Sequence, residues 1–219
     1  MNVGKLLETV NSLVPLDYAF DDDFVGLTVG SEDSEVKGVA VAHELENSIL
    51  DYSTNNNINT LITYHPPPLQ KILKDDGTET FEDDPLTAKC RESGLNIITI
   101  HTAQDVCNGG NAVSLVDLFG IRDTKVFAHT VGKFGAGRYG NITKTSNSNF
   151  KAIVESKLNT KIVRTNEYFQ EIKEINTIAI LPGSGTQFLE EIVSTVDVFI
   201  TGDISHRYLF NGDETHLGL

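Results

Sequence analysis

The sequence predicts an α/β protein with mixed, mostly parallel sheets. Short apolar runs such as 95–100 and 177–181 are continuous rather than alternating, which is typical of strands buried on both faces. Segments with helical apolar periodicity lie between these runs, and Gly, Pro and Asn mark many of the boundaries. Strands that alternate with helices along a chain favour parallel pairing.

The chain begins with a predicted helix. Its apolar residues recur at helical spacing and are Val3, Leu6, Leu7, Val10, Leu13 and Val14. Asn2 is a suitable N-cap, and Pro15 ends the helix. An acidic turn at 21–23 follows, and after it Gly26 and Gly30 indicate tight backbone turns.

Strand and helix then alternate through the rest of the chain. The predicted strands are 37–42, 60–64, 95–100, 135–142, 161–164, 177–181 and 197–200. The predicted helices are 45–52, 85–93, one after Gly109-Gly110, 150–158 and 188–193. The polar stretch 74–84 is expected to be a loop, and a domain boundary is expected near 121–135.

Composition excludes several classes of protein. The 219 residues include 17 Lys and Arg against 31 Asp and Glu, a formal net charge of −14, which argues against nucleic-acid binding. No apolar run approaches the roughly 20 residues of a membrane-spanning helix, and no secretory leader is recognisable in 1–14. Cys90 and Cys107 form neither a disulfide framework nor a zinc ribbon. We therefore expect a cytoplasmic protein.

Side chains able to bind a metal or move a proton follow four of the predicted strands. They are His43, Tyr64, His65, His101, Asp105, Asp203 and His206. Sites in open α/β sheets form beyond the carboxyl ends of the strands. Imidazole and carboxylate together suit zinc, iron, manganese or nickel, and such an ion activates water at neutral pH. The alternative is that each residue is only a hydrogen-bonded turn residue.

Two glycine-rich segments have a structural and a functional interpretation. The loop 181–186 follows a strand and precedes a helix, so it could hold a phosphate or simply allow tight packing. It lacks the lysine of a P-loop and the spacing of a dinucleotide-binding loop. Asp105 could likewise cap a local turn, and Gly109-Gly110 could be only a turn before a helix.

The order of several short strings resembles the Nif-three-like family (Ngg-one-interacting factor three-like), whose members are often labelled GTP-cyclohydrolase-like dinuclear metal proteins. These strings are Gly26-Leu27 with Gly30, Tyr64-His65-Pro66, His101 to Asp105, Gly109-Gly110-Asn111, Gly183-Ser184-Gly185 and Thr201 to His206. The resemblance covers nearly the whole chain. It implies two related α/β lobes, a two-metal site between them, and a ring-shaped homohexamer.

On this resemblance, residues 1–125 together with 195–219 form the metal-site lobe, and 126–194 form the second lobe. His65 and Asp105 match metal ligands of the family, with Asp105 as the bridging carboxylate. Tyr64 and His101 are expected to orient substrate or water. Asp203 and His206 are expected to lie behind the ligands as candidates for proton transfer.

The sequence departs from the family pattern in two places. Tyr64 stands where many members have a histidine, and no His-x-x-x-Glu string is found in the 219 residues. A neutral phenol is a poor metal ligand, and a catalytic zinc ion usually has three protein ligands. These departures keep two alternatives open, which are a non-catalytic metal-binding or protein-binding scaffold and a nucleotide-binding domain that uses Gly183 and Gly185. The first hypothesis is a metal-dependent hydrolase-like protein with a dinuclear or partial site and a small, phosphorylated or nucleotide-like substrate.

Overall fold

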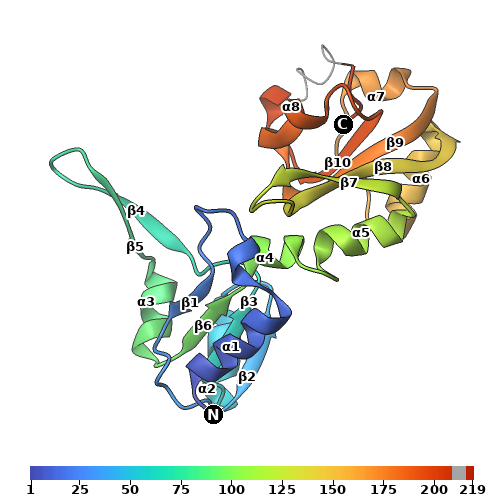
Figure 1. Ribbon diagram of the computed structural model, residues 1–219. Coiled ribbons are helices and arrows are strands. Elements are labelled where there is room, and N and C mark those ends of the chain that lie inside the picture. The colour runs from blue at the N-terminus through green and yellow to red at the C-terminus, as the bar shows by residue number, and fades with distance from the viewer. Residues whose placement is uncertain (209–215) are drawn as a thin grey trace. The chain divides into compact units, whose positions relative to one another are not determined.

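The computed structural model describes residues 1–208 and 216–219 of the chain. The chain forms two compact units, Met1–Cys107 and Asn108–Leu219 (Figure 1). Each unit has its own four-stranded sheet with helices packed on it, so the predicted mixed α/β fold is confirmed. In the part of the chain that is described, no helix is both long enough and apolar enough to cross a bilayer.

The sheet of the first unit has the strand order β1-β6-β3-β2. Its strands are β1 (Gly26–Val29), β2 (Val39–Ala42), β3 (Thr60–Thr63) and β6 (Asn96–Thr99). β2, β3 and β6 are parallel, and β1 pairs antiparallel with β6. Every residue of β6 is buried, as its continuous apolar run predicted.

Helices cover both faces of this sheet. They are α1 (Val3–Leu13), α2 (Asn47–Asn55), α3 (Pro85–Glu92) and α4 (His101–Val106), with a 3-10 turn at Leu16–Tyr18. Successive side chains of β6 point to opposite faces of the sheet. On one face, Ile98 packs with Val3 and Val10 of α1. Ile97 packs on the other side with Leu50 of α2 and Cys90 of α3.

The N-terminal helix matches its prediction closely. The Asn2 side chain accepts a hydrogen bond from the Lys5 amide at 3.0 Å, which satisfies one of the amides left free at a helix start. The helix stops at Leu13, two residues before Pro15. Its apolar stripe is what holds it against the sheet.

The stretch 74–84, predicted as a loop, contains half of a β-hairpin. β4 (Leu69–Leu73) and β5 (Glu79–Asp83) form an antiparallel ribbon that extends away from the sheet in Figure 1. The turn contains Gly77 at φ +81°. The ribbon was missed because its strands are rich in charged residues and bury little, so period-2 alternation is weak.

The sheet of the second unit has the strand order β10-β9-β8-β7. Its strands are β7 (Arg122–His129), β8 (Gly135–Ser146), β9 (Glu174–Ser184) and β10 (Val198–Asp203). β10 is parallel to β9, whereas the other two pairings are antiparallel. This sheet therefore differs from the mostly parallel expectation, because β7 and β8 are joined directly by the short 130–134 connection, which permits only antiparallel pairing.

The helices of the second unit pack on the same sheet. They are α5 (Asn111–Phe119), α6 (Asn147–Lys157), α7 (Glu167–Glu171) and α8 (Leu189–Ile192), with a 3-10 turn at Thr186–Phe188. Phe150 and Val154 of α6 and Leu115 of α5 contact the core around Ile178 of β9. The segment 161–164 is not a strand, and β7 was not predicted because its first half is charged and exposed.

The division into units differs from the expected lobes of 1–125 with 195–219 and of 126–194. Helix α5 packs against the core of the second sheet, and β10 is the edge strand paired with β9. The described part of 195–219 and the segment 108–125 therefore belong to the second unit. Sequence periodicity identifies such elements but does not say which sheet they join.

The first core is predicted to depend on Leu61, which is fully buried on β3. Leu61→Ala is expected to lower the free energy of unfolding by about 2–5 kcal/mol, because it removes packed methyl groups and leaves a cavity. Val41→Thr on the neighbouring strand is the control, since Val41 is 78% exposed, and its change should stay within about 0.5 kcal/mol. Urea denaturation measures both, and equal losses for the two variants would contradict this assignment of the core.

Candidate functional site

Four aromatic rings gather beyond the carboxyl ends of β2, β3 and β6. We call this set, His43, Tyr64, His65 and His101, the ring cluster. His65 is central, with its ring centroid 4.5 Å from that of His43, 5.0 Å from that of Tyr64 and 5.6 Å from that of His101. The three strands are parallel, so their carboxyl ends meet at one edge of the sheet, as predicted.

Backbone hydrogen bonds continue past the strand ends and align the segments that carry these rings. The His65 amide donates to the His43 carbonyl at 2.9 Å, and the His101 amide donates to the Tyr64 carbonyl at 3.0 Å. The strand-to-strand register therefore extends into the site. Backbone pairing rather than side-chain contact sets the spacing of the rings.

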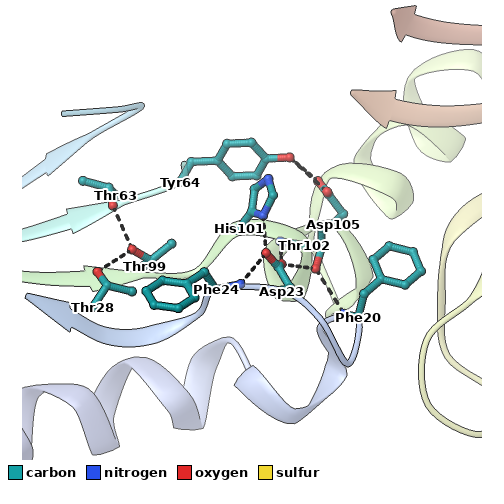
Figure 2. A network of polar contacts seen from close by, with 10 residues as sticks. All are labelled: Phe20, Asp23, Phe24, Thr28, Thr63, Tyr64, Thr99, His101, Thr102 and Asp105. Atoms are coloured by element: carbon teal, nitrogen blue, oxygen red, sulfur yellow. Dashed lines mark hydrogen bonds and ion pairs between the residues drawn. The ribbon is translucent and has the colours of Figure 1, made fainter. Parts of the chain in front are cut away.

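The Tyr64 hydroxyl is directed at Asp105 (Figure 2). Its oxygen lies 3.0 Å and 2.9 Å from the two carboxylate oxygens, so one O–H is shared between them. Asp105 lies on α4, four residues after His101 and on the same side of the helix, and it is only 4% exposed. Two of the predicted site residues are thus in direct contact.

A second polar network holds His101 from the opposite side (Figure 2). The His101 Nδ1 donates to Asp23 at 2.6 Å, and the Thr102 amide and hydroxyl also donate to this carboxylate. The Phe20 amide donates to the Thr102 hydroxyl at 3.3 Å, which fastens the 20–24 segment to the start of α4. Asp23 was missed as a site residue, because a contact spanning 78 positions leaves no local pattern in the sequence.

These contacts shift the pKa of His101 and the pKa of Asp23. The hydrogen bond to Asp23 is the largest cause of the raised pKa of His101, and the charges of Asp23 and Asp105 add to it against the opposing effect of burial. Burial favours a higher pKa for Asp23, but hydrogen bonds from His101 and Thr102 outweigh it and hold that pKa below its usual value. The pair fixes the His101 ring and keeps a proton on Nδ1, which leaves Nε2 for chemistry.

The outer part of the site is open to solvent. The His65 Nδ1 lies 3.4 Å from a carboxylate oxygen of Glu44, and their side chains are 39% and 51% exposed. The His43 ring is exposed and lies nearly parallel to the Tyr64 ring, with 5.3 Å between centroids and 8° between planes. The site therefore has a buried layer around Asp23 and Asp105 and an exposed layer of imidazoles.

The predicted residues Asp203 and His206 lie in the second unit. Asp203 ends β10 and His206 follows it, and both line a cavity of about 590 Å³ within that unit. The structure brings together Tyr64, His65 and His101 with Asp105 in the first unit. The roles predicted for Asp203 and His206 stay predictions.

The Gly183–Gly185 loop packs tightly. A Cβ added at Gly185 would lie 2.4 Å from the Phe199 ring, and the Gly183 carbonyl accepts a hydrogen bond from the Thr201 hydroxyl at 2.8 Å. Gly183 has φ +68°. Packing and backbone conformation thus account for both glycines, in keeping with the structural interpretation of this loop.

The described donors of the site do not form a ready-made metal centre. Across residues 1–208 and 216–219, no group of three or more His, Cys, Asp or Glu is arranged to hold an ion. The donors at hand are imidazoles and carboxylates, which suit borderline divalent ions. Both oxygens of Asp105 accept the shared Tyr64 hydroxyl, and each oxygen keeps a further lone pair.

A family model for Duf34/NIF3 (NGG1p interacting factor 3) matches residues 1–219. The chain belongs to the DUF34/NIF3 family. Curated relatives in this family include two proteins named GTP cyclohydrolase 1 type 2 homolog. The protein from Clostridium acetobutylicum is 26% identical over 228 residues, covering 100% of this chain and 82% of the relative. The protein from Methanocaldococcus jannaschii is 25% identical over 225 residues, covering 100% of this chain and 86% of the relative.

Solved structures of DUF34/NIF3-like proteins share this fold. The Staphylococcus aureus protein SA1388 matches with a TM-score of 0.77 at 25% identity, covering 100% of this chain and 84% of its own. A Bacillus cereus protein related to NIF3 matches with a TM-score of 0.80 at 17% identity, covering 100% of this chain and 86% of its own. The second likeness concerns the fold alone.

Asp23→Asn is predicted to lower the pKa of His101, because the amide removes the charge and the strongest hydrogen bond that stabilise the imidazolium. NMR titration of the His101 ring in the presence of a chelator measures this change. A His101 pKa unchanged by the substitution would contradict the role of Asp23.

The same pair predicts a pH dependence of stability. The folded-state pKa of His101 is raised above its ordinary 6.5, so its stabilising effect is complete below pH 6.5 and is lost as pH rises through the folded pKa. The folded-state pKa of Asp23 is lowered from 3.8, so its effect is present above pH 3.8 and is lost as pH falls through the folded pKa. Unfolding free energies of wild type and Asp23→Asn should therefore differ most between about pH 4 and 6.5, and a constant difference up to pH 10 would refute this.

Tyr64→Phe is predicted to destabilise the protein by about 1–3 kcal/mol, because the buried Asp105 carboxylate loses a donor while no cavity is created. Tyr52→Phe is the matched control, since Tyr52 is 58% exposed on α2, and it should change stability by less than about 0.5 kcal/mol. Chemical denaturation at pH 7 compares the two variants. Equal effects would show that the Tyr64 hydroxyl makes no net contribution.

Proposed function

We propose that this protein binds one divalent metal ion at the ring cluster and acts as a metal-dependent hydrolase-like protein on a small substrate. The observation that supports this most is the convergence of three imidazoles and Asp105 at one edge of the first sheet, half of them open to solvent. His65 and Asp105 are the proposed ligands. Zinc, iron, manganese and nickel are the candidate ions.

When bound, such an ion polarises a substrate oxygen and lowers the pKa of a coordinated water. The side chains around it have separate tasks. Tyr64 orients the Asp105 carboxylate through its hydroxyl. Glu44 faces Nδ1 of His65 and orients that ring, as carboxylates commonly do for histidine ligands.

His101 is the proposed proton donor. Its raised pKa keeps the imidazole protonated to higher pH than an ordinary histidine, and Asp23 holds the ring in place. A protonated imidazole can donate its proton to a leaving oxygen. The exposed side of the cluster gives a small substrate access to this residue.

The proposed substrates are phosphorylated or nucleotide-like small molecules. The relatives' name, GTP cyclohydrolase 1 type 2 homolog, makes GTP a rational member of a substrate panel. The net charge of −14 argues against nucleic acid as the ligand. We also propose a homohexamer, on the family resemblance, which light scattering after gel filtration tests.

A non-catalytic metal-binding or protein-binding scaffold is the second candidate. Tyr64 favours it, because a neutral phenol stands where many members of the family have a histidine ligand, which leaves fewer donors than a catalytic ion normally has. This candidate predicts metal binding without turnover, or neither.

Metal content tests the proposal directly. Protein purified without chelator is expected to hold close to one transition-metal ion per chain by elemental mass spectrometry, and His65→Asn and Asp105→Asn should hold much less. His216→Asn is the control, because His216 makes an edge-to-face contact with Tyr168 in the second unit and Asn tolerates its positive φ. Wild type that neither carries nor takes up an ion would overturn the proposal.

Turnover separates the two candidates. Wild type, His65→Asn and His101→Asn are each loaded with every candidate metal. All three proteins are then assayed against phosphoesters and nucleotides, GTP included. The hydrolase proposal expects turnover that falls at least about 100-fold without the proton donor. Metal binding with equal turnover in wild type, His65→Asn and His101→Asn would contradict the hydrolase proposal and favour the non-catalytic scaffold.

A further inference from the structure

β2 is an edge strand of the first sheet, and its outer edge is open (Figure 1). In the part of the chain that the structure describes, it pairs only with β3. The Gly38 and Ala42 carbonyls each accept a hydrogen bond at 3.2 Å from an amide on or just after β3. Successive residues of a strand direct their backbone groups to opposite edges. The amides and carbonyls of Val39 and Val41 therefore point outward, and these two residues are 40% and 78% exposed.

β2 lacks the features that normally keep an exposed edge from pairing. Natural edge strands are protected by charged residues, by bulges or by cover from other elements. β7, at the edge of the second sheet, carries Arg122, Asp123 and Lys125 and has a register shift against β8. β1, at the other edge of the first sheet, also has a register shift, and its residues are half-buried or buried. β2 has no charged side chain and a regular register, so its open edge can accept another strand.

The strand is suited to pair with its own copy. In an antiparallel pair about a two-fold axis, residues that face each other lie on the same face of the joined sheet. With the axis at Ala40, Val39 of each copy lies opposite Val41 of the other, and their outward amides and carbonyls bond to one another. With the axis at Val41, Val39 would face His43, whose carbonyl already accepts from the His65 amide. The Ala40 register therefore satisfies the outward groups best.

The same register matches side chains across the junction. Val41 is in register with Ile62, which packs with the apolar cluster under α1, so Val39 and Val41 lie on that face of the sheet. The valines of two copies would extend this apolar layer from one sheet to the next. At each end, Lys37 of one copy comes beside Glu44 of the other, and both side chains are exposed. Parallel pairing would instead place like charges together, so charge favours the antiparallel arrangement.

We infer that β2 is a self-association surface through which two copies of this chain pair antiparallel and join their first sheets into one. The inference rests on the self-association proposed above, names the strand that makes one of its contacts, and does not depend on a metal ion. It also places Lys37 of the partner subunit beside His43 and Glu44, at the exposed side of the ring cluster.

Sedimentation velocity of the full chain over a concentration series tests the contact. About 0.15 M salt screens most of the repulsion between copies that each carry a formal charge of −14. Wild type is expected to associate, and Val41→Lys to associate at least about 10-fold more weakly, because it sets like charges beside the two-fold axis. Val41→Thr stays β-branched and neutral and should associate as wild type does. Val163→Lys is the matched control, since Val163 is 96% exposed in the second unit, and it should also associate normally.

Ala40→Cys tests the register. The proposed axis sets residue 40 opposite its own copy with about 4.5 Å between the Cα atoms, which is within the range of a disulfide. Under a mild oxidant, Ala40→Cys is expected to give a covalent dimer in non-reducing electrophoresis. Adding Val41→Lys to the same chain should suppress it. Wild type is the control, because its two cysteines, Cys90 and Cys107, are buried.

The outcomes separate this inference from the rest of the proposal. Wild type that stays monomeric over the concentration series defeats both the homohexamer and this contact, and leaves the metal proposal standing. Association equal in wild type and Val41→Lys, or association without the Ala40→Cys cross-link, overturns the inference alone. A dimer that depends on β2 and grows no further supports the contact and contradicts the hexamer. Urea denaturation of each variant establishes that it is folded.

Discussion

The parallel pairing of β2, β3 and β6 is the constraint on which the rest of the site depends. Two backbone hydrogen bonds extend this pairing beyond the strands, from His65 to His43 and from His101 to Tyr64. They bring residues from three distant stretches of sequence to one edge with a fixed spacing. β6 is buried between α1 on one face and α2 and α3 on the other, so its end lies at a fixed place in the core. The apolar packing that fixes β6 in the core therefore also helps to position the polar side chains that follow its end.

The site has two layers with different physical roles. In the buried layer, Asp23 and Asp105 are each satisfied by hydrogen bonds from the protein, which offsets the cost of burying a carboxylate. In the exposed layer, His43 and His65 keep nitrogens available to solvent, and Glu44 orients one of them. This separation explains how Tyr64 can occupy Asp105 without closing the site.

Much of this arrangement could be predicted from the sequence. The apolar stripe of α1, its Asn2 cap, and the continuous apolar runs of β3 and β6 are local patterns, and the structure has each of them. The rule that sites lie beyond strand ends was enough to group Tyr64 and His65 with His101 and Asp105. The DUF34/NIF3 membership suggested by the order of short strings is confirmed.

The features that the sequence did not predict depend on contacts between distant residues. Asp23 pairs with His101 across 78 positions, and an acidic turn alone does not indicate its partner. The β4–β5 ribbon is charged and exposed, so it has no apolar alternation to detect. The assignment of β10 to the second sheet follows from its pairing with β9, which periodicity does not encode.

The central claim is that a metal ion is held at the ring cluster of the first unit. Anomalous diffraction from crystals grown with zinc tests it most directly. The account predicts one strong peak about 2.0–2.1 Å from a ring nitrogen of His65. No peak at the cluster, or a peak only beside Asp203 and His206 in the second unit, would contradict it.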